Sequence, residues 1–242
     1  ATHMPRIPTL AALALLAVAG CSGKADVKLR VENQTVAGAL AGATDRSLEL
    51  KLIAVYLAED VDPQTQNNIG ETQMIWLNAQ CNEDIQGCLP SGMSGGGPRV
   101  TSFFDFGQPT DVVNAAINGQ GRAVKAGTYR YARMEFCKYG MPGEPNLRWK
   151  GPGMTGSREM IVGDCGRTSQ VFSPPLALAD GESVTVTLGY DMAQSIQAGA
   201  PGPNGSMSIA GVDHWFRDCQ DLGDGTRVCM DFPDFQPTAT KE

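Results

Sequence analysis

The sequence predicts an all-β fold, an antiparallel β-sandwich with long Gly/Pro-rich loops and one or two short helices. Several segments alternate apolar and polar residues with a period of two, which is the pattern of half-buried strands. The 29 glycines and 15 prolines of the 242-residue chain gather between these segments, where turns are expected. A hydrophobic fraction of 42% is enough to build a packed core.

The clearest strand covers 184–190, where apolar residues alternate with two threonines and a glycine. Another strand begins with Leu48, Leu50 and Leu52, which alternate with charged residues, and it continues into the apolar run 53–57. This change of pattern predicts a strand that becomes buried on both faces. Further strands are predicted at 26–31, 74–77, 100–106, 129–137, 208–216 and 227–232.

Helix signals are few. Thr110 is a suitable N-cap for a short helix over 111–118, with Asp111 favourable in the first turn and Gly119 at the end. One further turn is predicted at 192–196. Because no repeat and no long polar linker divides it, we expect 27–242 to form a single domain. Its Gly/Pro-rich loops are expected at 92–98, 140–156 and 199–205.

The first 20 residues have the pattern of an export signal. The apolar run 10–19 is too short to cross a bilayer of about 30 Å, but it has the length of a signal-peptide core. It ends in Val18-Ala19-Gly20-Cys21, which resembles the lipobox of bacterial lipoproteins. The resemblance implies cleavage of the signal peptide 1–20, acylation of Cys21, a lipidated tether at 21–26 and, with Ser22 in place of Asp, sorting to the outer membrane.

The six cysteines that follow Cys21 indicate an oxidising compartment, because an even number in an exported chain is typical of disulfides. A zinc site is the alternative, but the chain has no C-x-x-C and a single His after residue 21. Many pairings are open, and we expect neighbours to pair. The expected bridges are Cys81–Cys88, Cys137–Cys165 and Cys219–Cys229, the last across a hairpin at 224–225.

Two short segments carry a resemblance to a known family. Residues 125–129 (KAGTY) open a charged, alternating strand, and residues 188–196 (LGYDMAQSI) place an aspartate at a strand end before Ser-Ile. These segments are similar to those of bacterial lipoproteins of unknown function with a prealbumin-like β-sandwich. The resemblance implies a prealbumin-like or immunoglobulin-like sandwich and an envelope location. It implies no reaction.

Charge and motifs argue against several classes of function. With 26 acidic against 19 basic residues the net charge is −7, which disfavours binding to nucleic acid. The chain lacks a G-x-S-x-G nucleophile motif, and the glycine-rich segment 92–97 lacks the Lys-Ser/Thr of a phosphate loop. His214 lies beside aromatic residues and is interpreted as a packed side chain. We therefore expect no enzyme.

Two sets of acidic and amide residues leave other functions open. Calcium takes oxygen ligands from loops, although Asp and Asn also form turns without any ion. The calcium candidates are Asp60, Asp62, Asn67, Asn68 and Glu71, with a smaller set of Asp218, Asp221 and Asp224. A hydrolase would need two carboxylates in one cleft. Its candidates are Asp213, Asp218, Asp221, Asp224, Asp231 and Asp234.

Trp149, flanked by Arg148 and Lys150 in a polar segment, is a candidate anchor for a protein or a glycan, because exposed aromatic residues contribute strongly to binding. Folding back over the sandwich is the alternative. The sequence thus predicts a lipid-anchored, non-catalytic binding or structural module of the bacterial outer membrane. Its expected partners are the membrane and an envelope protein or glycan. A calcium-binding lipoprotein and a hydrolase are the alternatives.

Overall fold

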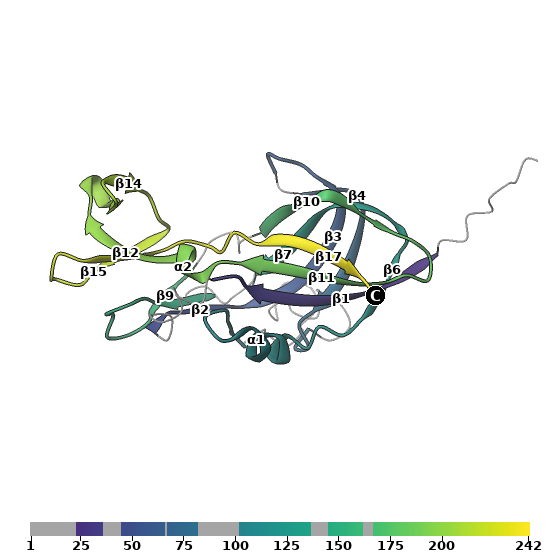
Figure 1. Ribbon diagram of the computed structural model, residues 1–242, viewed down its shortest axis with the longest axis horizontal. Helices are drawn as coiled ribbons and strands as arrows, with labels where there is room; N and C mark the ends of the chain where they lie inside the picture. Colours follow the sequence, from purple (N-terminus) through teal and green to yellow (C-terminus); the bar gives the residue numbers. More distant parts are fainter. Residues whose placement is uncertain (1–22, 36–44, 66, 82–101, 137–144, 162–166) are drawn as a thin grey trace, which may run out of the picture.

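The computed structural model describes residues 23–35, 45–65, 67–81, 102–136, 145–161 and 167–242. It confirms the all-β prediction, with four sheets that we call front, back, lower and distal. The molecule is elongated, and the described chain begins at one end of the long axis (Figure 1). Within the described ranges, no helix is long and apolar enough to cross a membrane.

The front sheet has the order β17-β11-β1-β6. Every second residue is buried along most of β1 and β11, as the period-two pattern predicts. β1 and β11 pair in parallel, whereas the other neighbours in this sheet are antiparallel. The strands are β1 (Lys24–Asn33), β6 (Arg122–Lys125), β11 (Ser183–Tyr190) and β17 (Gln236–Lys241).

The back sheet has the order β10-β7-β3-β4 and is antiparallel throughout. Most of β3 is buried on both faces, as its apolar run predicts. The pairing of β10 shifts register between Val171 and Leu176, where two prolines lack the N–H that a ladder needs. The strands are β3 (Leu52–Val61), β4 (Asn68–Leu77), β7 (Gly127–Phe136) and β10 (Arg167–Leu178).

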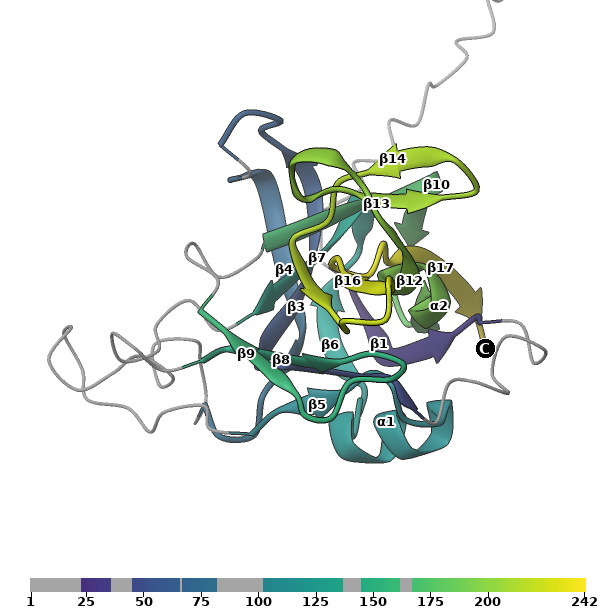
Figure 2. The same ribbon diagram turned by 90° about the vertical axis from the view of Figure 1, so that its left-hand side faces the viewer.

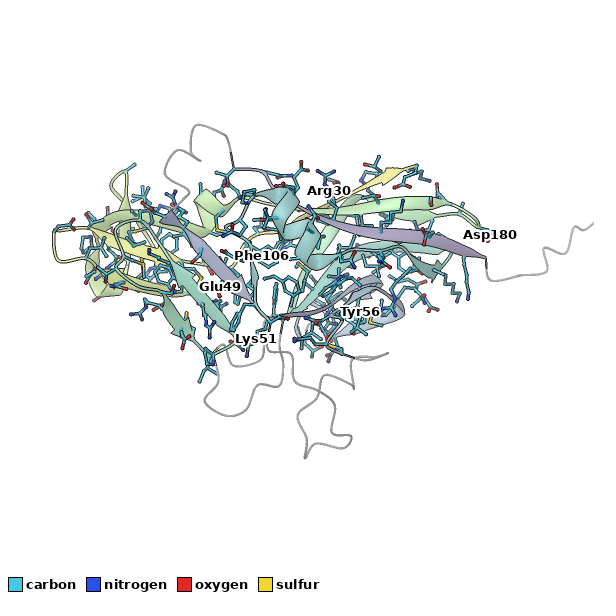
Figure 3. The ribbon with its side chains drawn as sticks, turned by 90° about the horizontal axis from the view of Figure 1, so that it is seen from below. Arg30, Glu49, Lys51, Tyr56, Phe106 and Asp180 are labelled. Carbon is cyan, nitrogen blue, oxygen red and sulfur yellow. A yellow bond between two sulfur atoms is a disulfide. The ribbon has the colours of Figure 1, made fainter. Side chains whose placement is uncertain are left out.

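The front and back sheets enclose one hydrophobic core. Phe106 lies near its centre (Figure 3). The Phe106 ring makes edge contacts with the rings of Tyr190 and Phe235, with centroids 5.4 and 5.6 Å apart. The Tyr190 hydroxyl donates a 2.8 Å hydrogen bond to the Phe106 carbonyl, so its polar tip is satisfied inside the core. Burial raises the pKa of Tyr190, which therefore stays neutral.

The lower sheet has the order β5-β2-β8-β9. The strand predicted from 48 to 57 is divided between this sheet and the back sheet, with the break at Lys51. Lys51 is buried, and its ammonium lies 5.0 Å from the centroid of the Phe103 ring. The strands are β2 (Ser47–Leu50), β5 (Phe104–Asp105), β8 (Leu147–Lys150) and β9 (Arg158–Met160).

Both predicted helices are present, as α1 (Thr110–Ile117) and α2 (Met192–Ser195). The predicted cap of α1 is wrong, because the N-cap is Pro109 and makes no side-chain bond. The Thr110 hydroxyl instead accepts a hydrogen bond from the backbone N–H of Asn33 in β1. Asn118, in the left-handed conformation, ends the helix one residue before the predicted glycine.

The distal sheet, residues 196–230, has the order β14-β13-β12-β16-β15 and lies at the end of the long axis opposite residue 23. Figure 2 looks along that axis and shows its strands in front of the other sheets. The strands are β12 (Ile196–Pro201), β13 (Met207–Ile209), β14 (Val212–His214), β15 (Asp218–Asp221) and β16 (Arg227–Met230), with a 3₁₀ turn η3 (Pro203–Gly205).

Several expected boundaries differ in the structure. The predicted loop 140–156 contains β8, and the loop 199–205 contains the end of β12 and η3. The segment 208–216 forms a hairpin of two strands rather than one strand. The strand predicted at 100–106 shortens to β5, and the loop 92–98 lies outside the described residues. The strands β6, β9, β10 and β17 were not predicted from the alternation pattern.

The segment that follows α1 passes close to β1, and a substitution at Gly119 tests this packing. A Cβ on Gly119 would lie 2.0 Å from the carbonyl oxygen of Leu29 in β1, so Gly119→Ala is expected to lower the free energy of unfolding by about 1–3 kcal/mol. Gly156→Ala is the matched control, because a Cβ there meets nothing within 4 Å. Urea unfolding measures both, and equal midpoints would contradict the close approach of this loop to β1.

Candidate functional site

The outer hairpin of the distal sheet and the residue that follows it carry two of the most exposed large apolar side chains in the described chain. β13 and β14 join through Ala210 and Gly211, whose φ angles of 51° and 81° form a two-residue hairpin turn. Trp215, directly after β14, is 67% exposed, and Val212 on β14 is 58% exposed. His214 is also exposed, so the interpretation of a packed side chain is wrong, although its ring lies 6.5 Å from that of Phe216. We call Val212, His214 and Trp215 the distal surface.

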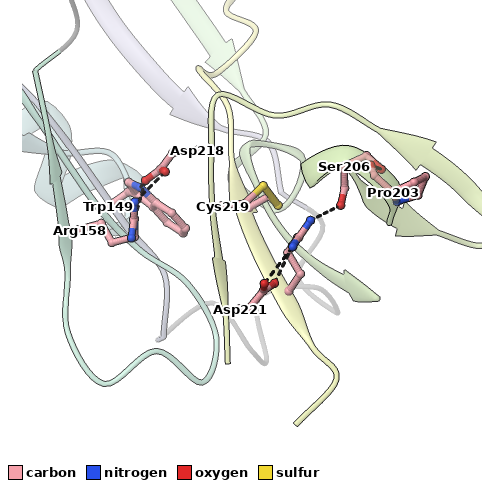
Figure 4. Close-up of a disulfide and its surroundings, with 9 residues drawn as sticks. Trp149, Arg158, Pro203, Ser206, Asp218, Cys219 and Asp221 are labelled. Carbon is pink, nitrogen blue, oxygen red and sulfur yellow. Dashed lines mark hydrogen bonds and ion pairs between the residues drawn. A yellow bond between two sulfur atoms is a disulfide. The ribbon is translucent and has the colours of Figure 1, made fainter. Parts of the chain in front are cut away.

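The hairpin of β15 and β16 is braced from within the distal sheet. Cys219 and Cys229 are cross-strand partners and form a disulfide, which confirms one predicted bridge (Figure 4). The Arg227 guanidinium binds both carboxylate oxygens of Asp221, at 2.6 and 2.9 Å, and donates a third hydrogen bond to the Ser206 carbonyl. The covalent and polar links therefore connect β16 to β15 and to the turn before β13.

A second set of contacts joins the distal sheet to the lower sheet. Asp218 on β15 accepts 2.6 and 2.9 Å hydrogen bonds from the Arg158 guanidinium on β9 and a 2.9 Å bond from the Trp149 indole N–H on β8 (Figure 4). Asp218 raises the pKa of Arg158 through the hydrogen bond. Bidentate pairs of this kind fix orientation as well as adding energy. We call these three residues the junction.

The junction corrects the prediction for Trp149. Its side chain is fully buried, so it folds back onto the body and is not an exposed anchor for a partner. The neighbouring Gly151 lies so close to the distal sheet that a Cβ there would be 2.3 Å from Val228. Arg148 forms a 2.7 Å ion pair with Glu159 on β9, and Lys150 is half-buried, so the predicted group is part of the lower sheet.

The strand that enters the distal sheet is held by a hydrogen-bonded cap. The Asp191 carboxylate accepts bonds from the Ala193 N–H at 2.9 Å and from the Thr35 hydroxyl at 2.8 Å. The Thr35 hydroxyl in turn accepts a 2.9 Å bond from the Met192 N–H. This cap places α2 at the end of β1 and directs β12 outward from the body, which explains the aspartate of the LGYDMAQSI segment in structural terms.

The predicted calcium residues are occupied by other partners. Asp62 accepts hydrogen bonds from the backbone N–H groups of Gln64 and Thr65, which lower the pKa of Asp62. Glu71 pairs with Lys125 at 2.9 Å. Within the described ranges, no group of three or more His, Cys, Asp or Glu residues is placed to hold a metal ion. The remaining candidates also have partners. Asp60 forms a 3.8 Å ion pair with Arg130, and the Asn68 side chain accepts a hydrogen bond from Arg133. The backbone N–H of Asn67 donates a hydrogen bond to the Thr65 hydroxyl.

Most of the C-terminal carboxylates have protein partners in the structure. Asp218 belongs to the junction and Asp221 to the Arg227 pair, which lowers the pKa of Asp221. A general acid requires a raised pKa. Among the described carboxyl groups the pKa of Glu49 on β2 is raised, because of burial and the nearby Asp105, and Glu49 is not one of these candidates. Asp231 lies near Arg217, and Asp234 accepts a hydrogen bond from Gln236. Asp224 accepts a hydrogen bond from the backbone N–H of Thr226, and Asp213 is exposed.

Among the other predicted cysteines, only Cys81 lies within the described residues. Cys81 is disulfide-bonded. Cys88, Cys137 and Cys165 lie outside the described residues, as does Cys21, so their pairing and lipidation stay predictions.

Trp215 was not predicted as a site residue from the sequence. Its only local signal is a large aromatic residue between two short polar stretches, and the same signal surrounds the buried Trp149. The direction in which each indole points is decided by the tertiary packing of its hairpin.

Comparison with protein-family models, curated proteins and solved structures finds no match to the chain. The candidate site therefore has to be interpreted from its own geometry.

Two aspartate–arginine pairs on β15 test the junction. Asp218→Ala leaves the buried indole N–H of Trp149 without an acceptor and is expected to lower the free energy of unfolding by about 1–3 kcal/mol. Asp221→Ala is the matched control, because Asp221 makes an equivalent bidentate pair but its side chain is 56% exposed. We expect a smaller loss for Asp221→Ala in urea unfolding, below about 1 kcal/mol, because the exposed carboxylate adds little net energy. Equal losses for both variants would contradict the special role of Asp218.

Proposed function

We propose that the protein is a lipid-anchored, non-catalytic binding module of the bacterial outer membrane, and that it presents its distal surface to an envelope protein. The lipobox at 18–21 supports the anchor, and the disulfide supports an extracytoplasmic location. Two acyl chains or more give stable membrane attachment where one is marginal.

The exposed indole of Trp215 carries the proposal. Tryptophan is highly buried on average in folded proteins, whereas Trp215 is 67% exposed, and Trp is enriched among the residues that dominate protein–protein binding. The Cys219–Cys229 disulfide and the Arg227 bonds restrict the backbone of the distal sheet, so little backbone entropy is lost there when a partner binds. An exposed apolar group on a rigid support is typical of a binding surface.

The position of the distal surface agrees with an anchor at Cys21. Two residues, Ser22 and Gly23, separate Cys21 from Lys24, the first residue of β1, so the Cα atoms of Cys21 and Lys24 lie at most about 11 Å apart. The end of the molecule at β1 therefore lies near the bilayer, while the distal sheet lies at the other end of the long axis (Figure 1). This arrangement places Trp215 where a partner can reach it away from the membrane.

Photocrosslinking in cells tests both halves of the proposal. A photoreactive amino acid at position 214, beside Trp215, is expected to give a discrete adduct with one envelope protein in the membrane fraction. Trp215→Ala should abolish the adduct, because the indole supplies the apolar contact. The same probe at Val112 on α1, which is 48% exposed, is the control and should not yield that adduct.

The membrane fraction is compared with that of Cys21→Ala in the same experiment. We expect the substituted protein to be released into the soluble fraction. Retention of Cys21→Ala on washed membranes would contradict the anchor. An adduct that persists in Trp215→Ala, or the same adduct from position 112, would contradict the distal surface.

A further inference from the structure

A pocket of about 750 Å³ lies on the side of the body, away from the distal surface. Its walls are the end of β4, residues 102–104, the last turn of α1 and the chain that enters β6. The volume is in the range of sites that bind small molecules. We call it the side pocket, and the residues that matter for its chemistry are Trp76, Phe104, Asn118, Gln120 and Arg122.

The apolar wall of the side pocket is fixed in place. Trp76 and Phe104 form an edge-to-face pair with centroids 5.8 Å apart. The Trp76 indole donates a 2.9 Å hydrogen bond to the carbonyl of Ile117, at the end of α1. Both rings are largely buried, so the pocket meets a preformed aromatic wall.

The polar wall offers amide side chains. Asn118 and Gln120 are exposed, and their side chains make no hydrogen bond within the part of the chain that the structure describes. An amide both donates and accepts hydrogen bonds, as a hydroxyl does. Paired amides beside aromatic rings therefore match a ligand that presents several hydroxyls on one side and C–H groups on the other.

Arg122 lines the side pocket and adds a positive charge that pairs with no carboxylate among the described residues. Its Nη1 atom is buried and has no hydrogen-bond partner among the described residues. The residues lining the side pocket include no carboxylate. Asp26 lies against the adjacent Gly121, yet it forms no ion pair with Arg122 within the described chain. A guanidinium pairs most strongly with a planar carboxylate, so an arginine that lines a pocket without a carboxylate favours an acidic ligand.

We propose that the side pocket binds a sugar that carries a carboxylate, with Arg122 as the residue that selects the acidic group. The carboxylate pairs with the guanidinium, and the hydroxyls bond to Asn118 and Gln120. C–H groups of the sugar contact the small part of Trp76 and Phe104 that stays exposed. This site is separate from the distal surface and does not depend on what that surface binds.

Binding of matched saccharides tests the inference on the full chain in detergent. The probes are trigalacturonic acid, its methyl ester, and sialyllactose, measured by isothermal titration calorimetry. We expect at least one acidic probe to bind. For trigalacturonic acid, the uncharged ester should bind at least about 10-fold more weakly, because a charge-assisted pair is stronger than a neutral hydrogen bond. Arg122→Gln should remove this preference for the acid.

Two controls separate ligand binding from folding. Arg130→Gln changes an exposed arginine that lies 3.8 Å from Asp60 on the back sheet, and it should leave binding unchanged. Arg122→Gln should keep or raise the melting temperature, because the buried Nη1 atom of the half-buried Arg122 has no hydrogen-bond partner among the described residues. Failure of both acidic probes to bind, equal affinity for acid and ester, or unfolding by Arg122→Gln would each overturn the inference.

Discussion

The Asp218 carboxylate joins the distal sheet to the lower sheet and fixes their relative orientation. It stands on β15 of the distal sheet and accepts hydrogen bonds from Trp149 and Arg158 of the lower sheet. The buried indole has no other described acceptor, so this one group satisfies a core donor and an arginine together. The orientation of the distal sheet, and with it the position of Trp215, depends on this contact.

The remaining links support the same orientation from other directions. The cap of Asp191 and Thr35 directs β12 out of the front sheet, and Gly151 allows the lower sheet to approach Val228 without a clash. The disulfide and the Arg227 pair then stiffen the outer hairpins. Because these contacts are distributed over several elements, the distal sheet extends the sandwich and is not a separate tail.

Sequence patterns predicted the elements whose two faces differ strongly. The period-two alternation of 184–190 identified β11, and the neighbouring cysteines 219 and 229 identified their bridge. The pattern failed for β10, where two prolines interrupt the strand, and for β8 and β9, which lie in Gly/Pro-rich sequence. In each of these cases pairing with a neighbouring strand, which is a tertiary effect, decides the structure.

Side-chain environment was harder to predict than strand position. Trp149 and Trp215 both follow polar, loop-like sequence. Trp149 is buried and donates a hydrogen bond to Asp218, whereas Trp215 is exposed directly after a hairpin. That Arg122 pairs with no carboxylate among the described residues is equally invisible in sequence, because pairing is a property of packing. The aspartates that suggested calcium or hydrolysis are explained by arginine pairs and turns that sequence density does not show.

The rigid connection between body and distal sheet is tested most directly by a distance measurement between spin labels. Labels at positions 112 on α1 and 212 on β14 are both exposed and lie on the two parts that the junction connects. Double electron–electron resonance on the full chain should give one narrow distance distribution, which broadens when Asp218 is replaced by alanine. A broad or double distribution in the unsubstituted background would contradict the account.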